Sequence, residues 1–185
     1  MLNNSVIVHF ANNKWTVDST SELKGIVAHL YRNEADNSIY LQVIKYSDTY
    51  DTTLIYEYTE GRYRELYKTI WDKHWATVSL INGEVLFVLR TEIARIRDQQ
   101  FQTVLNLGNT KFYENIWERN SKDIFIEMTD GLAHYNGTDI EYLFHHDQPN
   151  VGIFDAVLFQ GDVFFLVHEY DTGLSLVYHG TFTKQ

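Results

Sequence analysis

Residues 123–144 alternate apolar and polar side chains in three short runs, separated by breaks at Asp130-Gly131 and Asn136-Gly137. Asp-Gly and Asn-Gly supply the positive φ angles that two-residue hairpin turns require, so the pattern predicts three antiparallel strands in a row. This meander constrains the fold more than any other stretch, because it recurs along the chain.

The recurring motif is a strand that ends in an aromatic or large apolar residue, then a polar turn, then an aromatic or apolar residue that opens the next strand. The copies are Phe10–Trp15, Tyr58–Tyr63, Ile96–Phe101, Tyr135–Ile140 and a shorter fifth copy, Tyr178–Phe182. We call the aromatic or apolar residue that opens the second strand of each copy its anchor. The anchors stand at positions 15, 63, 101, 140 and 182, so successive steps are 48, 38, 39 and 42 residues. These steps match the period of a four-stranded propeller blade.

Two further strands precede each of the last four hairpins. The first of each pair is expected near Gly25–Leu30, Trp75–Leu80, Tyr113–Trp117 and Ile153–Phe159, and the second at Ser38–Gln42, Val85–Leu89, Ile124–Met128 and Val163–Val167. The predicted fold class is therefore all-β: a β-propeller or propeller segment with four complete four-stranded blades and an N-terminal half-blade, Val6–Asp18. By local apolar spacing alone, Thr91–Leu107 and Tyr58–Leu80 also fit helices, which would make the fold α+β.

Composition narrows the other possibilities. The chain has one proline, no linker-like stretch and 15% aromatic residues, so we expect a single domain over residues 1–185. A net charge of −10 with scattered basic residues argues against nucleic acid as a partner. The absence of cysteine excludes disulfides and thiolate metal sites. No run reaches the roughly 18 apolar residues of a membrane span, the first residues do not read as a signal peptide, and no cofactor motif is present.

Residues 123–144 also resemble a known repeat. The order DIF, DG, LAHYNGT and a closing hydrophobic residue is similar to bacterial β-propeller proteins of the pattern D-I-[WF]…G…HY[ND]G…W, whose functions are mostly unassigned. Ile140 stands where that family has tryptophan, and Arg95-Ile96 replaces His-Tyr in another copy. The resemblance implies a propeller fold and an extracellular or periplasmic location. It implies no catalytic residue, because the motif residues form turns and pack between blades.

The candidate ligand-binding residues lie on or beside the expected innermost strands, which line the central channel of a propeller. The polar candidates are His29, Asn115 and Asp155, and the aromatic candidates are Trp71, Trp75 and Trp117. Aromatic faces beside carboxylates and amides suit a carbohydrate, and two carboxylates roughly 5–9.5 Å apart would hydrolyse one. The alternative is that most of these residues belong to the core.

Three other polar stretches contain residue types that can bind a metal ion. Adjacent side chains on an extended chain point in opposite directions, so at most two of the three residues His145-His146-Asp147 could bind the same ion. This stretch is therefore expected to be an exposed polar loop. The acidic loops Asn33–Asn37 and Ser47–Asp51 carry oxygens suited to calcium but lack the closing glutamate of an EF-hand. The longer loops Tyr46–Thr53 and Glu169–Gly173 should project from one rim, either as binding loops or as solvated turns.

The sequence contains no nucleophile, metalloprotease or phosphate-loop motif, so an enzyme is not the favoured interpretation. The expected function is a non-catalytic binding module for a protein or glycan. The alternatives are a glycoside-active propeller enzyme or lectin with its site in the channel, and a structural spacer domain. Because the half-blade Val6–Asp18 leaves the first blade incomplete, we expect either further blades upstream or an exposed strand edge that supports self-association.

Overall fold

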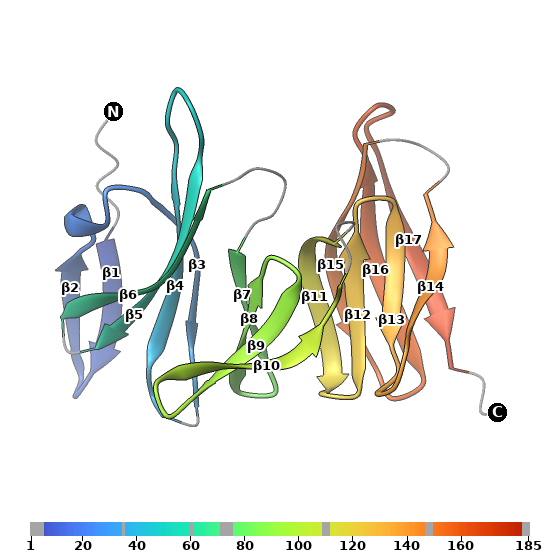
Figure 1. Cartoon of the computed structure of the whole chain (residues 1–185). Coiled ribbons are helices and arrows are strands. Elements are labelled where there is room, and N and C mark those ends of the chain that lie inside the picture. The colour runs from blue at the N-terminus through green and yellow to red at the C-terminus, as the bar shows by residue number, and fades with distance from the viewer. Residues whose placement is uncertain are drawn as a thin grey trace. The chain divides into compact units, whose positions relative to one another are not determined.

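The computed structural model describes residues 6–34, 36–59, 61–70, 76–108, 112–146 and 150–182. Within these ranges the secondary structure consists of β-strands and one short 3-10 helix, η1 (Ser21–Leu23). The strands form four blade-like antiparallel sheets and an N-terminal two-stranded sheet, so the predicted all-β propeller class is confirmed (Figure 1). The chain divides into two compact units, Met1–Leu105 and Asn106–Gln185, which are described separately.

The first unit contains the N-terminal hairpin, sheet 1 (order β3-β4-β5-β6) and sheet 2 (order β10-β9-β8-β7). The hairpin strands are β1 (Val6–Ala11) and β2 (Lys14–Ser19). Sheet 1 is built from β3 (Ile26–Arg32), β4 (Ile39–Lys45), β5 (Thr52–Thr59) and β6 (Arg62–Ile70). Sheet 2 is built from β7 (Ala76–Ile81), β8 (Glu84–Leu89), β9 (Glu92–Arg97) and β10 (Gln100–Asn106).

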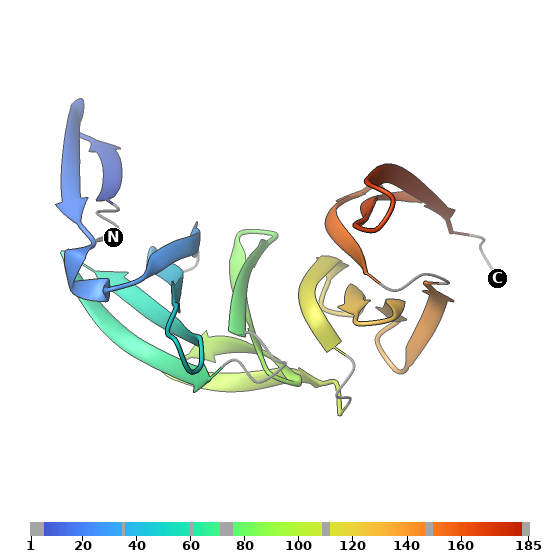
Figure 2. The ribbon, with the colours of Figure 1, turned by 90° about the horizontal axis from the view of Figure 1, so that it is seen from above.

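The second unit contains sheet 3 (order β11-β12-β13-β14) and sheet 4 (order β15-β16-β17). Sheet 3 is built from β11 (Phe112–Asn120), β12 (Asp123–Met128), β13 (Gly131–Tyr135) and β14 (Ile140–His145). Sheet 4 is built from β15 (Val151–Leu158), β16 (Asp162–Glu169) and β17 (Leu174–Thr181). Sheets 3 and 4 lie side by side within this unit (Figure 2), and a shared cluster of buried apolar residues joins them.

Each sheet follows the chain order, and its strands pair with their sequence neighbours. The Thr91–Leu107 segment forms β9 and β10, so the hairpin predicted there is correct and the helical alternative is wrong. Tight turns close several hairpins with positive φ at non-glycine residues, as at Asn12 and Asn13 or at Asp98 and Gln99. Two consecutive positive φ values match the primed turns that fit the twist of a hairpin.

Both turns of the 123–144 meander differ in detail from the prediction: the first has two residues but is shifted by one position, and the second, residues 136–139, is longer. The loop between β12 and β13 consists of residues 129–130, and Gly131 opens β13 opposite Met128. A Cβ at Gly131 would come within 2.2 Å of the Phe144 carbonyl oxygen, so glycine is required by close backbone approach. At the second turn, the Asn136 Oδ1 accepts hydrogen bonds from the N–H groups of Thr138 and Asp139, both at 2.9 Å.

The fifth predicted hairpin, Tyr178–Phe182, is wrong. Strand β17 runs without a break from Leu174 to Thr181, in continuous register with β16. Gly180 lies opposite Val163 and is not among the residues with positive φ, so it makes no turn. The short motif resembles a turn in sequence, but residues 178–181 form the paired C-terminal end of β17. Sheet 4 consequently has three strands among the described residues, where the other blades have four.

The core of each unit lies between consecutive sheets and repeats the same contact. Tyr40 on β4 meets Phe87 on β8 edge to face, with ring centroids 5.0 Å apart. Phe125 on β12 meets Phe165 on β16 in the same way, at 5.3 Å. All four side chains are at most 2% exposed. Burying side chains of this size contributes roughly 1.5–3 kcal/mol each, so these contacts hold the sheets together.

The repeat also carries a polar pair in each of the four sheets, between a residue at or just before the start of the second strand and a residue of the third strand. The pairs are Ser38–Glu57 at 3.3 Å, Glu84–Arg95 at 4.0 Å, Asp123–His134 at 2.7 Å and Asp162–His179 at 2.8 Å. In the last two blades the imidazole also stacks on a phenylalanine of the second strand, Phe125 or Phe164, with centroids 4.6 and 4.4 Å apart. These histidines are structural parts of the repeat.

Candidate functional site

The predicted polar candidates occupy related positions on the first strands of their sheets. His29 on β3 lies opposite Gln42, and Asp155 on β15 lies opposite Leu166. Asn115 on β11 reaches Glu127 of β12 with its side chain. In all three strands the pairing register shifts beside the candidate residue. A bulge at this point re-aims the side chain, and the bulge recurs with the blade.

In the second unit, Asn115 belongs to a polar contact that joins sheets 3 and 4. The Asn115 Nδ2 donates to Glu127 Oε2 at 2.8 Å and lies 3.4 Å from the Ile153 carbonyl oxygen. The Glu127 Oε1 accepts the backbone N–H of Ile153 at 2.8 Å, and Glu127 is only 2% exposed. Both carboxylate oxygens of Glu127 are therefore committed to holding β15 against β11 and β12.

In the first unit, the corresponding residue of the second strand, Gln42, likewise joins two sheets. Gln42, which is fully buried, donates from Nε2 to the Ala76 carbonyl oxygen at 2.8 Å. The Thr77 hydroxyl lies 3.4 Å from Gln42 Oε1. Gln42 and Glu127 stand at equivalent places on the second strands of their blades, and each reaches the first strand of the following sheet. The sequence did not predict the role of either residue, because a single polar residue within an apolar strand gives no sign that it makes a buried hydrogen bond to another sheet.

The other described candidates each make local contacts of their own. Trp117 is half-buried and packs edge to face on Phe165 at 5.8 Å, within the apolar cluster between sheets 3 and 4. Asp155 is exposed, and its Oδ1 accepts the N–H of Ala156 at 2.8 Å. Burial lowers the pKa of His29, and its ring stacks on Tyr31 at 6.1 Å. Trp71 and Trp75 lie outside the described residues. The ligand-binding role of these six residues stays a prediction.

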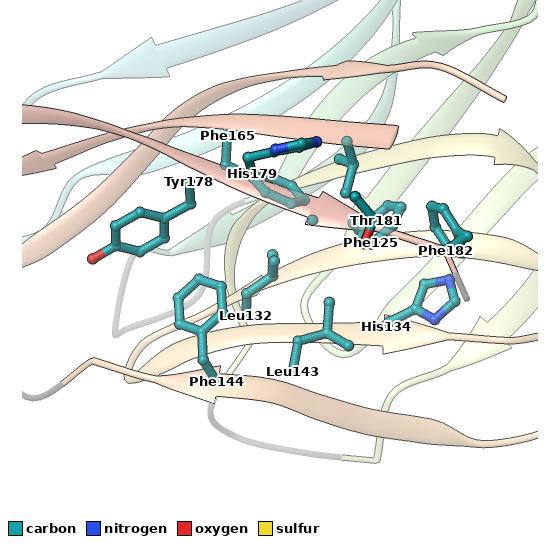
Figure 3. A pocket seen from close by; sticks show the side chains of 12 residues that line it. Phe125, Leu132, His134, Leu143, Phe144, Phe165, Tyr178, His179, Thr181 and Phe182 are labelled. Carbon is teal, nitrogen blue, oxygen red and sulfur yellow. The ribbon is translucent and has the colours of Figure 1, made fainter. Parts of the chain in front are cut away.

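A pocket of about 460 Å³ opens between sheets 3 and 4 (Figure 3). Leu143 and Phe144 of β14 lie on one side, Phe165 and Tyr178 of sheet 4 on the other, and His134 with Phe182 at one end. The lining is mainly aromatic and aliphatic. It consists of Phe125, Leu132, His134, Leu143, Phe144, Val163, Phe165, Tyr178, His179, Gly180, Thr181 and Phe182.

The strand that carries Leu143 bends in a way that aims two consecutive apolar residues at the pocket. Leu132 of β13 lies opposite Phe144 and Ala133 opposite Tyr142, so Leu143 has no partner across the pair. Such a bulge lets Leu143 and Phe144 both face the neighbouring sheet. Phe144 meets Tyr178 edge to face at 5.2 Å, whereas Leu143 remains 49% exposed. The exposed leucine marks the open part of the pocket.

One end of the pocket is bordered by a chain of hydrogen-bonded polar groups, Arg119, Asp123 and His134. The Arg119 Nε donates to Asp123 Oδ2 at 2.6 Å, and His134 Nε2 lies 2.7 Å from Asp123 Oδ1. The Arg119 guanidinium also lies over the Phe182 ring, 3.7 Å from its centroid. Burial by itself would raise the pKa of Asp123, but the hydrogen bonds from Arg119 and His134 outweigh burial and lower it. This end of the pocket is therefore a fixed wall.

The other predicted polar stretches form local structure. His145 stacks on Tyr142 at 4.2 Å and lies 3.8 Å from Asp130, while Asp147 lies outside the described residues. In the 46–51 loop, the Ser47 N–H donates to Asp51 Oδ1 at 3.1 Å.

Over the part of the chain that the structure describes, no three His, Asp or Glu side chains come together as a metal site. None of the described helices is long and apolar enough to cross a membrane.

The pocket residues were missed because no short motif marks them and they meet only across two sheets. A signal existed in the fourth strands, where the anchor residue is followed three and four positions later by apolar residues, as in Ile140, Leu143 and Phe144.

Comparison of the chain with known protein families and with curated proteins finds no match to either.

Proposed function

We propose that this chain is a non-catalytic binding module whose ligand is a polypeptide, and that an apolar side chain of the ligand enters the pocket between sheets 3 and 4. The observation that carries this proposal is the pocket itself. Its volume of about 460 Å³ lies within the roughly 300–1,000 Å³ that is typical of ligand sites. Its walls are mainly aromatic and aliphatic. Leu143 is half-exposed, so a ligand that covers this side chain removes apolar surface from water, which favours binding.

The polar groups at the pocket favour a polypeptide over a glycan. A sugar needs several hydrogen-bonding groups that converge on its hydroxyls. The two histidines of the lining already pair with carboxylates, His134 with Asp123 and His179 with Asp162. An aromatic or branched aliphatic side chain requires no such partners and gains roughly 1.5–3 kcal/mol from burial. This favours a protein segment as the ligand.

The other predicted functions remain as rivals with their own expectations. A glycoside-active enzyme needs a free pair of carboxylates, yet Glu127 gives both of its oxygens to Asn115 and Ile153. A lectin should bind oligosaccharides through Asn115, Asp155 or Trp117. A structural spacer should bind nothing.

The proposal is tested by selecting binders from a random peptide library displayed on phage, with the purified full chain as bait. Selected peptides should be enriched in aromatic or branched aliphatic residues. Their affinity should fall at least tenfold for a Leu143→Arg variant, since burying an unpaired charge in an apolar pocket is costly, on the order of several kcal/mol. Leu80→Arg is the matched control, because Leu80 in the first unit is 43% exposed, close to the 49% of Leu143.

Binders that are insensitive to Leu143→Arg would overturn the pocket as the binding site. An oligosaccharide array is run in parallel with the same protein. A sugar that raises the unfolding midpoint, and loses this effect in an Asn115→Ala or Asp155→Ala variant, would establish the lectin interpretation instead. If neither screen yields a ligand, the binding proposal is rejected in favour of the spacer.

A further inference from the structure

We propose that the ligand binds as an extended strand that adds to the outer edge of β17, which pairs only with β16 in the described part of the chain, and so completes sheet 4. Its aromatic anchor would enter the pocket. This inference rests on the proposed function, because it assigns the binding mode and the residue pattern of the polypeptide that the pocket receives. Three observations lead to it: the open edge of β17, the occupied counterpart of the pocket in the first unit, and a residue pattern common to the fourth strands.

The edge of β17 is available for pairing. Sheet 4 has the order β15-β16-β17 in the described part of the chain, so β17 is an outer strand. The Phe182 N–H donates to the Gly161 carbonyl oxygen at 2.9 Å, in line with the β16–β17 register. Since antiparallel partners alternate, Ser175, Val177, His179 and Thr181 direct their backbone groups away from β16. Strand β17 contains no Lys, Arg, Asp, Glu or Pro, the residues that commonly protect such edges.

The first unit shows what fills the corresponding place. Leu66 and Tyr67 of β6 stand where Leu143 and Phe144 stand in β14, and Leu66 is likewise a bulge residue, because Tyr67 pairs with Ile55 and Glu65 with Tyr56. Tyr67 packs edge to face on Phe101 at 6.3 Å, and Phe101 packs on Phe87 at 5.2 Å.

Phe101 lies on β10, the fourth strand of sheet 2. The matching walls in the second unit, Phe144 and Phe165, border the pocket. The pocket is therefore where a fourth strand of sheet 4 would place its anchor.

The fourth strands of the complete blades share a residue pattern. An aromatic or apolar anchor is followed three and four positions later by two apolar residues. The triplets are Tyr63, Leu66 and Tyr67 in β6, Phe101, Val104 and Leu105 in β10, and Ile140, Leu143 and Phe144 in β14. The partner segment should carry the same pattern, with an aromatic residue as its anchor.

The probe is a fluorescently labelled peptide with the sequence of residues 98–107, DQQFQTVLNL, titrated into the full chain. The control peptide carries Phe101→Ser. Saturable binding is expected, weakened at least about tenfold by the control substitution, since each 1.4 kcal/mol corresponds to a factor of ten. Peptides selected by phage display are titrated in the same way, so that failure of this one sequence is separable from failure of the pocket.

Two protein variants separate strand addition from simple pocket filling. Val177→Pro removes an outward backbone N–H at a position that tolerates proline, because that N–H does not pair with β16. Val177→Thr keeps the N–H and the β-branched side chain. Strand addition predicts at least about tenfold weaker peptide binding for Val177→Pro and a change within about twofold for Val177→Thr. Thermal unfolding of both variants verifies that they are folded.

Amide hydrogen exchange of the unsubstituted chain gives a second readout that needs no variant. Bound peptide should protect the N–H groups of Val177, His179 and Thr181. Binding that is lost with Leu143→Arg but retained with Val177→Pro, without this protection, would overturn strand addition and leave the pocket proposal intact. Binding that is insensitive to Leu143→Arg would overturn both.

Discussion

The contact between sheets 1 and 2 and the contact between sheets 3 and 4 are built on the same plan but are completed differently. Tyr40–Phe87 corresponds to Phe125–Phe165 in both position and edge-to-face geometry. In the first unit Phe101 adds a third ring to this contact, whereas in the second unit the same place is a pocket. The aromatic pair is therefore common to both contacts. Whether the space beside it is filled or open to a ligand depends on the fourth strand of the second sheet in each contact.

The two contacts also differ in their buried polar groups. Gln42 is neutral and donates to a carbonyl oxygen, whereas Glu127 accepts an N–H and an amide. Each arrangement satisfies a first-strand backbone group that would otherwise be buried without a partner. The first three of the four predictions that follow test how far the two contacts are equivalent, and the last tests the exposed N-terminal hairpin.

The largest effect is expected from Glu127→Ala. The substitution leaves the Ile153 N–H without its acceptor and removes the partner of Asn115, so we expect a loss of about 3 kcal/mol in the free energy of unfolding. Gln42→Ala should cost less, about 2 kcal/mol, because a neutral amide makes weaker hydrogen bonds than a carboxylate. Urea unfolding of both variants measures the two values. Equal losses would show that the charge of Glu127 adds nothing.

Phe101→Ala should make the first contact resemble the second. Phe101 is half-buried, so the loss should be about 2 kcal/mol, below the roughly 3–5 kcal/mol of a fully buried phenylalanine. The variant should acquire a cavity between Tyr67 and Phe87 that resembles the pocket of the second unit. A crystal structure of the variant would show the cavity, and collapse of Tyr67 into the vacated space would contradict the prediction.

Asp123→Asn tests the charged end wall of the pocket. Because the pKa of Asp123 is lowered in the folded chain, its ionised form stabilises the fold above the usual Asp pKa of about 4, and this contribution is lost as the pH falls through the lowered value. We expect the variant to be about 1 kcal/mol less stable at pH 7, with the difference shrinking below about pH 4.

Glu84→Gln is the matched control in sheet 2, where the pairs with Arg95 and Arg97 are more exposed. Exposed pairs contribute little, so its effect should be about 0.5 kcal/mol or less. Chemical unfolding of both variants from pH 2.5 to pH 7 measures the two profiles. A difference for Asp123→Asn that does not change with pH would show that the lowered pKa plays no part.

The smallest effect is expected at the N-terminal hairpin. Trp15 is 67% exposed and touches Phe10 across the hairpin, with ring centroids 5.0 Å apart. Trp15→Ser should therefore cost about 0.5 kcal/mol, the order of a cross-strand aromatic pair. Thermal unfolding measures this. A loss comparable to that of Phe101→Ala would mean that this face is buried in solution, as self-association of the chain through the hairpin would require.

Much of the fold was predictable because strand alternation and turn residues act locally. The strand positions and the four blades follow from hairpin signals that lie within a few residues of one another, such as Asn82-Gly83 between β7 and β8. The exception, Tyr178–Phe182, shows the limit of local signals. Glycine is compatible with a turn but also with an extended strand. Gly180 is part of a strand because it pairs with Val163 of β16.

The candidate site was much less predictable. Asn115 and Trp117 were singled out as channel residues, and the structure places both between sheets 3 and 4, with Asn115 bonded to Glu127 and Trp117 packed on Phe165. Leu143, Phe144 and Tyr178 carry no chemical signal in the sequence. Their importance comes from meeting across two sheets, a contact between residues more than thirty positions apart.

The sequence by itself determined the class of this protein, because apolar alternation and turn residues specify which segments pair with their neighbours. Only the tertiary structure decided that the space filled by Phe101 in one unit remains a pocket bordered by Leu143 and Phe165 in the other. The physical reason is that a pocket is defined by what does not fill a space. The packing of separate sheets sets that space, and no single stretch of the chain encodes it.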